Sequence, residues 1–219
     1  MKINGFIPRR LRHSYGHWTP RYIYDRLAVM WFQFKNPDAP WLTKTAVEFL
    51  QSWLSTDHIG LEWGSGRSTL WLTRRIKHLT SVEHSEEWFN RLVRKIDELH
   101  LDNITYLYKS DLDQGLNSSY VRIVDEFSHH SLDFVLVDGA LRDLCAFSVL
   151  PLLKPGGVLM IDNVNWYLPC QTRSPSSRTD WQGPASPYWA GFNAQVSNWR
   201  YIWTTNGVWD TAIWIKPAR

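Results

Sequence analysis

The sequence predicts an α/β protein in which a doubly wound parallel sheet is closed by a C-terminal antiparallel hairpin. Between residues 42 and 163, short apolar runs typical of strands alternate with amphipathic segments typical of helices. This alternation builds a parallel sheet with helices on both faces. The C-terminal region differs, because two strand-like runs flank Asn206-Gly207, a dipeptide that favours a hairpin turn.

The parallel strands are predicted from apolar runs that lead into glycine or polar residues. They cover residues 58–63, 78–84, 104–110, 132–139 and 158–162. The run 132–139, LDFVLVDG, is almost wholly apolar, which is typical of a central strand buried on both faces. The hairpin is expected within residues 198–217.

Helices are predicted between these strands, at residues 42–54, 67–76, 85–100, 118–127 and 140–153. Thr43 is the expected N-cap of the first helix. The clearest amphipathic segment is 85–100, in which Ser85 is the expected N-cap and acidic residues follow at the positive end of the helix. Its apolar face is expected to consist of Trp88, Leu92, Ile96 and Leu99.

The composition is that of a soluble globular protein. The chain has 219 residues, of which 44% are hydrophobic and 21% are charged, and no apolar run reaches the roughly 18 residues that a transmembrane helix needs. A net charge of +3 is too small to predict a nucleic-acid partner. Only two cysteines are present, Cys145 and Cys170, so we expect a reducing, cytoplasmic environment.

The chain is expected to divide into a basic N-terminal arm, residues 1–41, and a single domain, residues 42–219. An arm of this kind is either solvated or touches an acidic substrate or a membrane surface. Its first 30 residues hold one acid, Asp25, against the cations Lys2, Arg9, Arg10, Arg12, Arg21 and Arg26.

Residues 164–190 are rich in Pro, Ser, Gly and Trp and are predicted to form one long loop. A loop of this length inside a compact domain is usually functional or disordered. No pattern in the sequence indicates the oligomeric state.

Acidic and small polar residues stand at the end of every predicted parallel strand. The carboxyl ends of parallel strands share one edge of the sheet, where proteins of this class bind their ligands. We therefore expect one binding site at this edge. The residues concerned are Glu62, Gly64 and Gly66 in the first turn, Glu83 in the second, Ser110 and Asp111 in the third, Asp138 in the fourth, and Asp162 and Asn163 in the fifth.

The first of these turns discriminates between two classes of ligand. A dinucleotide-binding turn has the pattern G-x-G-x-x-G, but Thr69 stands at the third glycine position and Glu62 would repel a pyrophosphate. S-adenosylmethionine has an ammonium group and no phosphate, so the same carboxylate would attract it. The helix N-terminus at Ser65–Ser68 can meet the carboxylate of this ligand, and Glu83 can accept hydrogen bonds from both ribose hydroxyls.

Four segments, LEWGSGRST, SVEHS, LDFVLVDG and LLKPGGVLMIDN, together resemble the class I S-adenosylmethionine-dependent methyltransferases. The resemblance covers about residues 42–163 and implies a Rossmann-like fold. It implies that Glu83 holds the ribose, that His84 packs on the adenine and that Ser110-Asp111 faces the adenine edge. The cofactor-binding residues that it implies are Glu62, Gly64, Ser65, Gly66, Ser68, Glu83, His84, Ser110, Asp111 and Asp138.

The ends of the fourth and fifth strands are similar to those of metal-dependent O-methyltransferases of the catechol and macrolide-sugar types. This resemblance implies that Asp138, Asp162 and Asn163 bind Mg²⁺. The catechol type has a lysine where this chain has Leu141, followed by Arg142, and an arginine hardly ever gives up its proton. The general base is therefore unassigned, and Asp138 is equally compatible with a metal-free role facing the substrate or the cofactor.

His129 and His130 are further candidates for the general base, although a solvated turn before the fourth strand explains them better. If a metal is bound, it can lower the pKa of a coordinated hydroxyl and reduce the need for a strong base.

The function that these patterns favour is methyl transfer from S-adenosylmethionine to a small hydroxyl acceptor, which can be a sugar, a phenol or a glycan. Residues 164–190 would cover the acceptor. Two alternatives remain at this stage, a regulatory protein that binds S-adenosylmethionine without turnover and an NAD-dependent oxidoreductase. The aromatic residues expected to contact the acceptor are Trp166, Tyr167, Trp181, Tyr188 and Trp189.

Overall fold

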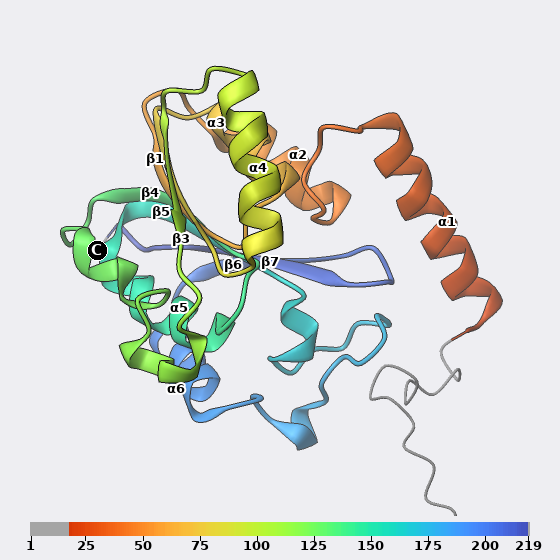
Figure 1. Ribbon diagram of the computed structural model, residues 1–219. Helices are drawn as coiled ribbons and strands as arrows, with labels where there is room; N and C mark the ends of the chain where they lie inside the picture. Colours follow the sequence, from red (N-terminus) through yellow and green to blue (C-terminus); the bar gives the residue numbers. More distant parts are fainter. Residues whose placement is uncertain (1–17, 219) are drawn as a thin grey trace, which may run out of the picture.

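The computed structural model describes residues 18–218. Within them, a seven-stranded sheet runs in the order β3-β2-β1-β4-β5-β7-β6 (Figure 1). The pairs from β3 to β5 are parallel, and β7 is antiparallel to both β5 and β6. The predicted fold class is confirmed. The strands are β1 (Ile59–Trp63), β2 (His78–Glu83), β3 (Ile104–Tyr108), β4 (Leu132–Val137), β5 (Leu153–Asp162), β6 (Arg200–Thr205) and β7 (Asp210–Ile215).

The helices are α1 (Pro20–Lys35), α2 (Lys44–Trp53), α3 (Arg67–Thr73), α4 (Glu86–Glu98), α5 (Arg142–Val149) and α6 (Pro187–Gln195). The predicted cap of α4 is confirmed, because the Ser85 side chain accepts a hydrogen bond from the Trp88 N–H. Residues 118–127 are not α-helical as predicted and contain the 3-10 helix Arg122–Glu126. Helices α1 and α6 were not predicted.

Thr43 stands at the N-cap position of α2, but its hydroxyl does not cap the helix. Instead, Thr43 Oγ1 lies 2.5 Å from Thr204 Oγ1 in β6, and the Thr43 N–H donates to Thr211 Oγ1 in β7 at 3.2 Å. The predicted capping role is therefore replaced by buried bonds that attach α2 to the hairpin.

The core consists of two layers, one on each face of the sheet. Alternate residues of β4 divide between them. Val135 and Val137 pack with α5 and α6, whereas Phe134 and Leu136 pack with α2 and α3. Burial on both faces explains why the sequence of β4 is apolar almost throughout. The two layers hold the ends of the parallel strands, where the candidate site lies.

Residues 164–190 are folded to a greater extent than the predicted loop. They contain the 3-10 helices Val164–Trp166 and Asp180–Gln182 and the start of α6. Asp210, at the start of β7, binds this segment, because its carboxylate accepts hydrogen bonds from the hydroxyls of Thr172 and Ser174 at 2.6 Å each.

The basic part of the predicted N-terminal arm is only partly visible, since Lys2, Arg9, Arg10 and Arg12 lie outside the described residues. The rest of the arm includes α1, which stands at the periphery of the molecule (Figure 1). Among residues 18–218, no helix is both long and apolar enough to cross a bilayer.

Candidate active site

Two tight turns meet at the carboxyl ends of β1 and β4. Trp63 pairs with Val137, so the following residues, Gly64 and Asp138, lie beside each other. Gly64 has a φ of +89°, and a Cβ atom added there would lie 2.6 Å from the Cα and N atoms of Gly139. Only glycine can occupy this position without moving the neighbouring turn. The first glycine therefore allows the Asp138 turn to pack against the turn after β1.

A cavity of about 370 Å³ opens at the turn after β1. The predicted cofactor residues that line it are Gly64, Ser65, Gly66, Ser68 and Asp138. Glu62, Glu83, His84, Ser110 and Asp111 are not part of its lining. Its remaining residues were missed by the sequence reasoning, and they include Trp41 and the α4 side chains Trp88, Arg91 and Lys95. The spacing of Trp88, Arg91 and Lys95 on one helix face is the signal that would have found these three.

Glu62 lies beneath the turn and is completely buried. One carboxylate oxygen, Oε2, accepts hydrogen bonds from the hydroxyls of Thr69 and Ser81, each at 2.6 Å. The other oxygen, Oε1, is buried and has no hydrogen-bond partner. Burial raises the pKa of Glu62 to about 7. A buried carboxylate oxygen without a partner is costly, so a donor that reached this atom would stabilise the side chain.

Glu83 ends β2, and its carboxylate is used by the protein itself. Oε2 accepts from the N–H and the hydroxyl of Ser65 at 2.9 and 2.8 Å. Oε1 accepts from the N–H groups of His84 and Ser85 at 2.9 and 2.8 Å. Burial alone would raise the pKa of Glu83. The His84 side chain, whose Nδ1 lies 3.2 Å from Oε1, and the bonds from Ser85 and Ser65 outweigh it and lower the pKa to about 2. The ribose contact stays a prediction, and it requires the Ser65 hydroxyl to release Glu83.

Asp111 also binds its own chain. It accepts hydrogen bonds from the N–H and hydroxyl of Ser119 at 2.7 and 2.8 Å and from the Ser118 hydroxyl at 3.1 Å. The Ser119 N–H contributes most to lowering the pKa of Asp111 to about 2. His84 packs edge-to-face on Tyr120. Asp111 and His84, which were predicted to contact the adenine, therefore have partners within the protein.

Arg142 stands where the predicted magnesium ligands converge. Its guanidinium donates to the Asp138 carboxylate at 2.8 Å and to the Asn163 side chain at 3.0 Å. It also donates to the backbone carbonyls of Asp138, Gly139 and Asp162. The positive charge between the predicted magnesium ligands Asp138 and Asn163 is therefore the guanidinium of Arg142.

The Asp162 carboxylate has a partner in β7, because the Thr211 hydroxyl donates to its Oδ1 at 2.5 Å. Burial and the nearby Asp138 charge raise the pKa of Asp162 well above its usual range. Within residues 18–218, no group of three or more His, Cys, Asp or Glu side chains is placed to hold a metal. The Mg²⁺ site stays a prediction, and a metal bound there would have to displace Arg142 from Asp138 and Asn163.

Asp138 is the acidic side chain in the lining of the cavity. Burial raises its pKa to about 6, and the charge of Arg142 opposes this rise. Leu141, just before Arg142, has a φ of +44°, a conformation that is costly for a side chain of this size. The strained turn directs Arg142 back towards Asp138.

The histidines considered as bases lie elsewhere. His130 Nδ1 is 3.1 Å from the carbonyl of Leu153, at the start of β5. This is the opposite edge of the sheet from Asp138, because β4 and β5 are parallel. Neither His129 nor His130 can act at the cavity.

Comparisons with known proteins agree with this geometry. Residues 61–164 match the model of a family described as a methyltransferase domain. No curated protein matches the sequence. The matched range includes the turn after β1 and Asp138, so this match points to a methyltransferase domain.

Solved structures share the fold of this chain. A SAM-dependent methyltransferase from Aquifex aeolicus is 14% identical, with a TM-score of 0.51 over 84% of this chain and 96% of that chain. A protein from Corynebacterium glutamicum is 14% identical, with a TM-score of 0.57 over 96% and 97%. A candidate methyltransferase from Streptococcus mutans in complex with SAH is 13% identical, with a TM-score of 0.50 over 77% and 94%. At identities this low, the likeness shows a shared fold alone.

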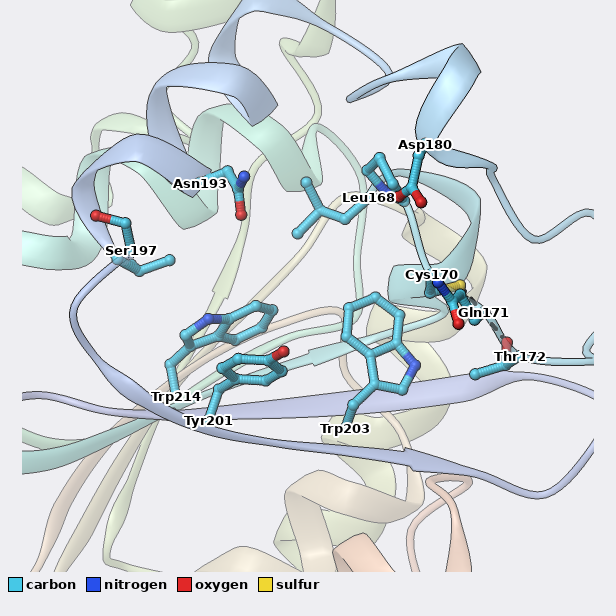
Figure 2. A pocket seen from close by; sticks show the side chains of 12 residues that line it. Leu168, Cys170, Gln171, Thr172, Asp180, Asn193, Ser197, Tyr201, Trp203 and Trp214 are labelled. Carbon is cyan, nitrogen blue, oxygen red and sulfur yellow. Dashed lines mark hydrogen bonds between the residues drawn. The ribbon is translucent and has the colours of Figure 1, made fainter.

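A second cavity, of about 820 Å³, lies between the hairpin and residues 168–197 (Figure 2). Tyr201, Trp203 and Trp214 rise from β6 and β7 towards Leu168 and Asn193 (Figure 2). The Tyr201 and Trp214 rings stack at 6.3 Å with an interplanar angle of 27°. The cavity therefore combines an aromatic wall with polar side chains.

The aromatic residues predicted to contact an acceptor have different environments. Trp189 is buried in the core, where it stacks on Tyr167 at 5.2 Å. The prediction that Trp189 contacts an acceptor is therefore wrong. Trp166, Trp181 and Tyr188 are exposed. The aromatic wall of the second cavity comes from the hairpin, which the sequence reasoning did not connect with an acceptor.

Proposed function

We propose that this protein is a methyltransferase that transfers a methyl group from S-adenosylmethionine to a hydroxyl oxygen of a sugar, a phenol or a glycan. The observation that carries the proposal is the Asp138 carboxyl in the wall of the cavity, with a pKa raised to about 6. A carboxylate with this pKa is mostly ionised at neutral pH and remains a useful proton acceptor.

The residues at the turn fit S-adenosylmethionine. Bound there, this cosubstrate supplies an electrophilic methyl group on its sulfonium. Glu62 lies beneath the cavity, so its unpartnered Oε1 would receive the ammonium group through a bridging water. The open space at Gly66 lets a ligand approach the backbone closely. Glu62 has a pKa of about 7, so a cation would stabilise its charged form.

An NAD-dependent reaction is less well supported by the same turn. The Gly66 N–H donates to the Thr69 hydroxyl oxygen at 2.9 Å, and the Thr69 hydroxyl donates to Glu62. In a dinucleotide-binding turn, a third glycine would stand at Thr69 and the backbone N–H groups would face the pyrophosphate. Thr69 instead joins the turn to a buried carboxylate.

Asp138 would accept the proton of the acceptor hydroxyl at its carboxylate, while Arg142 holds that carboxylate in one orientation. No metal takes part in this scheme, because Arg142 fills the space between Asp138 and Asn163. Alignment of donor and acceptor can lower the barrier of such a displacement by on the order of 7–11 kcal/mol. The fixed carboxylate would therefore also orient the acceptor hydroxyl towards the methyl group.

The second cavity supports a sugar-containing acceptor. The segment after β5 begins at Asn163, which binds Arg142, and continues to Leu168 and Thr172, which line the second cavity. An extended glycan could therefore lie along this segment. Aromatic rings offer flat apolar surfaces to sugar rings, and polar side chains such as Asn193 fix the orientation of a ligand in a pocket.

A comparison of Asp138→Asn with the parent enzyme tests the proposal. We expect methyl transfer to model glycosides and phenols to fall by about 100-fold or more, with little change in S-adenosylhomocysteine binding. The activity of the parent should rise with pH through about 6, since the base must lose its proton. Asp125→Asn, which changes an exposed acid in an ion pair with Arg122, is the control. An unchanged rate and pH profile in Asp138→Asn would contradict the role of Asp138.

A further inference from the structure

Helix α1 has one face that is fixed to the rest of the molecule. Asp25 and Val29 on this face are buried. The Asp25 carboxylate accepts hydrogen bonds from Arg173 Nε at 2.9 Å and Nη2 at 3.2 Å. Gly207, in the hairpin turn, lies against the same carboxylate and leaves no room for a Cβ atom. These contacts hold α1 in a defined orientation.

The other face of α1 is apolar and exposed. Its side chains recur at the three- and four-residue spacing of one helix stripe, and each is between 45% and 75% exposed. A continuous apolar surface of this kind indicates an interaction site. The residues are Ile23, Tyr24, Leu27, Met30, Trp31 and Phe34.

Cations accompany this apolar face. Arg21, Arg26 and Lys35 are exposed, whereas Asp25, the acid within α1, is buried. Lys35 Nζ lies 4.9 Å from the centre of the Trp31 ring, so a positive charge stands at the edge of the apolar stripe. A helix with aromatic residues on one side and Lys or Arg beside them is typical of the interface of a membrane.

A basic hollow of about 530 Å³ adjoins the C-terminal end of α1. Its lining includes the cations Lys35, Arg74 and Arg75 and the acid Asp38. Arg75 is held in place, since it donates to the Trp71 carbonyl at 2.8 Å. Burial and then the neighbouring Arg74 lower the pKa of Arg75. A phosphate between these cations would relieve their repulsion.

We propose that α1 lies in the surface of a bilayer containing anionic phospholipids. Its apolar stripe would face the acyl chains, and the hollow at Lys35, Arg74 and Arg75 would hold a lipid phosphate. This interaction goes beyond methyl transfer, and it would place the active site next to acceptors in or near the membrane. A second copy of the chain is a poorer occupant, because its own α1 would bring the same positive charges to the contact.

Co-sedimentation of the full chain with vesicles tests this proposal. We expect binding to vesicles of phosphatidylglycerol in phosphatidylcholine and much weaker binding to phosphatidylcholine alone. The double variant Leu27→Glu with Phe34→Glu should lower binding at least about tenfold, because it places two charges on the inserted stripe. Leu99→Glu changes an apolar side chain of similar exposure at the end of α4 and should bind like the parent.

The hollow is tested by Arg74→Glu. This exposed residue should be needed for the preference for phosphatidylglycerol, so its replacement should lower binding to the anionic vesicles by about fivefold or more. Binding of inorganic phosphate without vesicle binding would contradict a membrane-bound role. Circular dichroism and S-adenosylhomocysteine binding show whether each variant is folded.

Failure of the parent to bind anionic vesicles would overturn the proposal, as would equal binding by the double variant. Light scattering addresses the second copy. If the parent forms a dimer, does not bind vesicles, and loses the dimer in the double variant, the apolar stripe serves self-association instead. Methyl transfer to a soluble acceptor is measured separately, so loss of the membrane interaction does not count against the proposed enzyme activity.

Discussion

Arg142 connects the polar residues at the ends of β4 and β5. A single guanidinium bonds to Asp138, Asn163 and three backbone carbonyls. This arrangement satisfies a buried cation by many hydrogen bonds, which buried charges require. It also opposes the rise in the pKa of Asp138 that burial causes. Arg142 is therefore a positioning residue that keeps the proposed base both oriented and ionised.

We predict that methyl transfer survives exhaustive chelation and that Arg142→Ala lowers it by about 10-fold or more. Without the guanidinium, the pKa of Asp138 should rise further, because an opposing positive charge is lost. The pH at which activity reaches half its maximum should then move upwards. Arg122→Ala, an exposed arginine paired with Asp125, should leave the profile unchanged. Complete loss of parent activity on chelation, with recovery on adding Mg²⁺, would refute this assignment.

Individual residues also mark the limit of what the sequence could predict. Gly64 and Asp138 were expected at the site because strand ends share one edge of a parallel sheet. The partners of Glu83 and Asp111 were not predictable, since Ser65 and Ser119 reach them only in the folded chain. The position of Arg142 depends on the left-handed backbone at Leu141, which no sequence pattern announced.

Among the structural elements, the turn from β1 to α3 is the most constrained. Its first glycine combines a positive φ with close contact to the turn after β4. These two constraints can be separated, because Gly156 has a similar φ of +80° but open space around its Cβ position. The pair therefore distinguishes backbone strain from the packing of one turn on another.

We predict that Gly156→Ala lowers the free energy of unfolding by about 1–2 kcal/mol, the cost of a left-handed residue with a side chain. Its affinity for S-adenosylhomocysteine should not change. Gly64→Ala should lose more stability and at least about tenfold in that affinity, because the new Cβ displaces the Asp138 turn. Denaturant unfolding and calorimetry measure the two effects. Equal affinities in the two variants would show that the contact between the turns does not shape the cosubstrate site.

Some helices and strands were easier to predict from their sequence patterns than others. The strands and α4 were predicted because their periodicity is regular and their boundaries carry caps or glycines. Helix α1 was missed, although Leu27, Met30, Trp31 and Phe34 have helical spacing. These side chains face away from the core, so the apolar stripe does not follow from packing within the domain and would have suggested a partner.

At the scale of the whole molecule, three separate surfaces would have three different roles. The turn after β1 would hold the cosubstrate, the second cavity would hold the distal part of the acceptor, and α1 would rest on a bilayer. The buried Asp25, bonded to Arg173 in the segment after β5, joins α1 to the acceptor side. The fold class was predictable, but the contact between α1 and the segment after β5 was not, because it joins residues 148 positions apart.

The central claim, that the turn binds S-adenosylmethionine and not a dinucleotide, is tested most directly by calorimetric titration of the full chain with S-adenosylhomocysteine and with NAD. Glu62 lies beneath the turn with one unpartnered oxygen, and Thr69 occupies the third glycine position. We therefore predict saturable binding of S-adenosylhomocysteine and no detectable heat with NAD. Tight binding of NAD, with no response to S-adenosylhomocysteine, would contradict the claim.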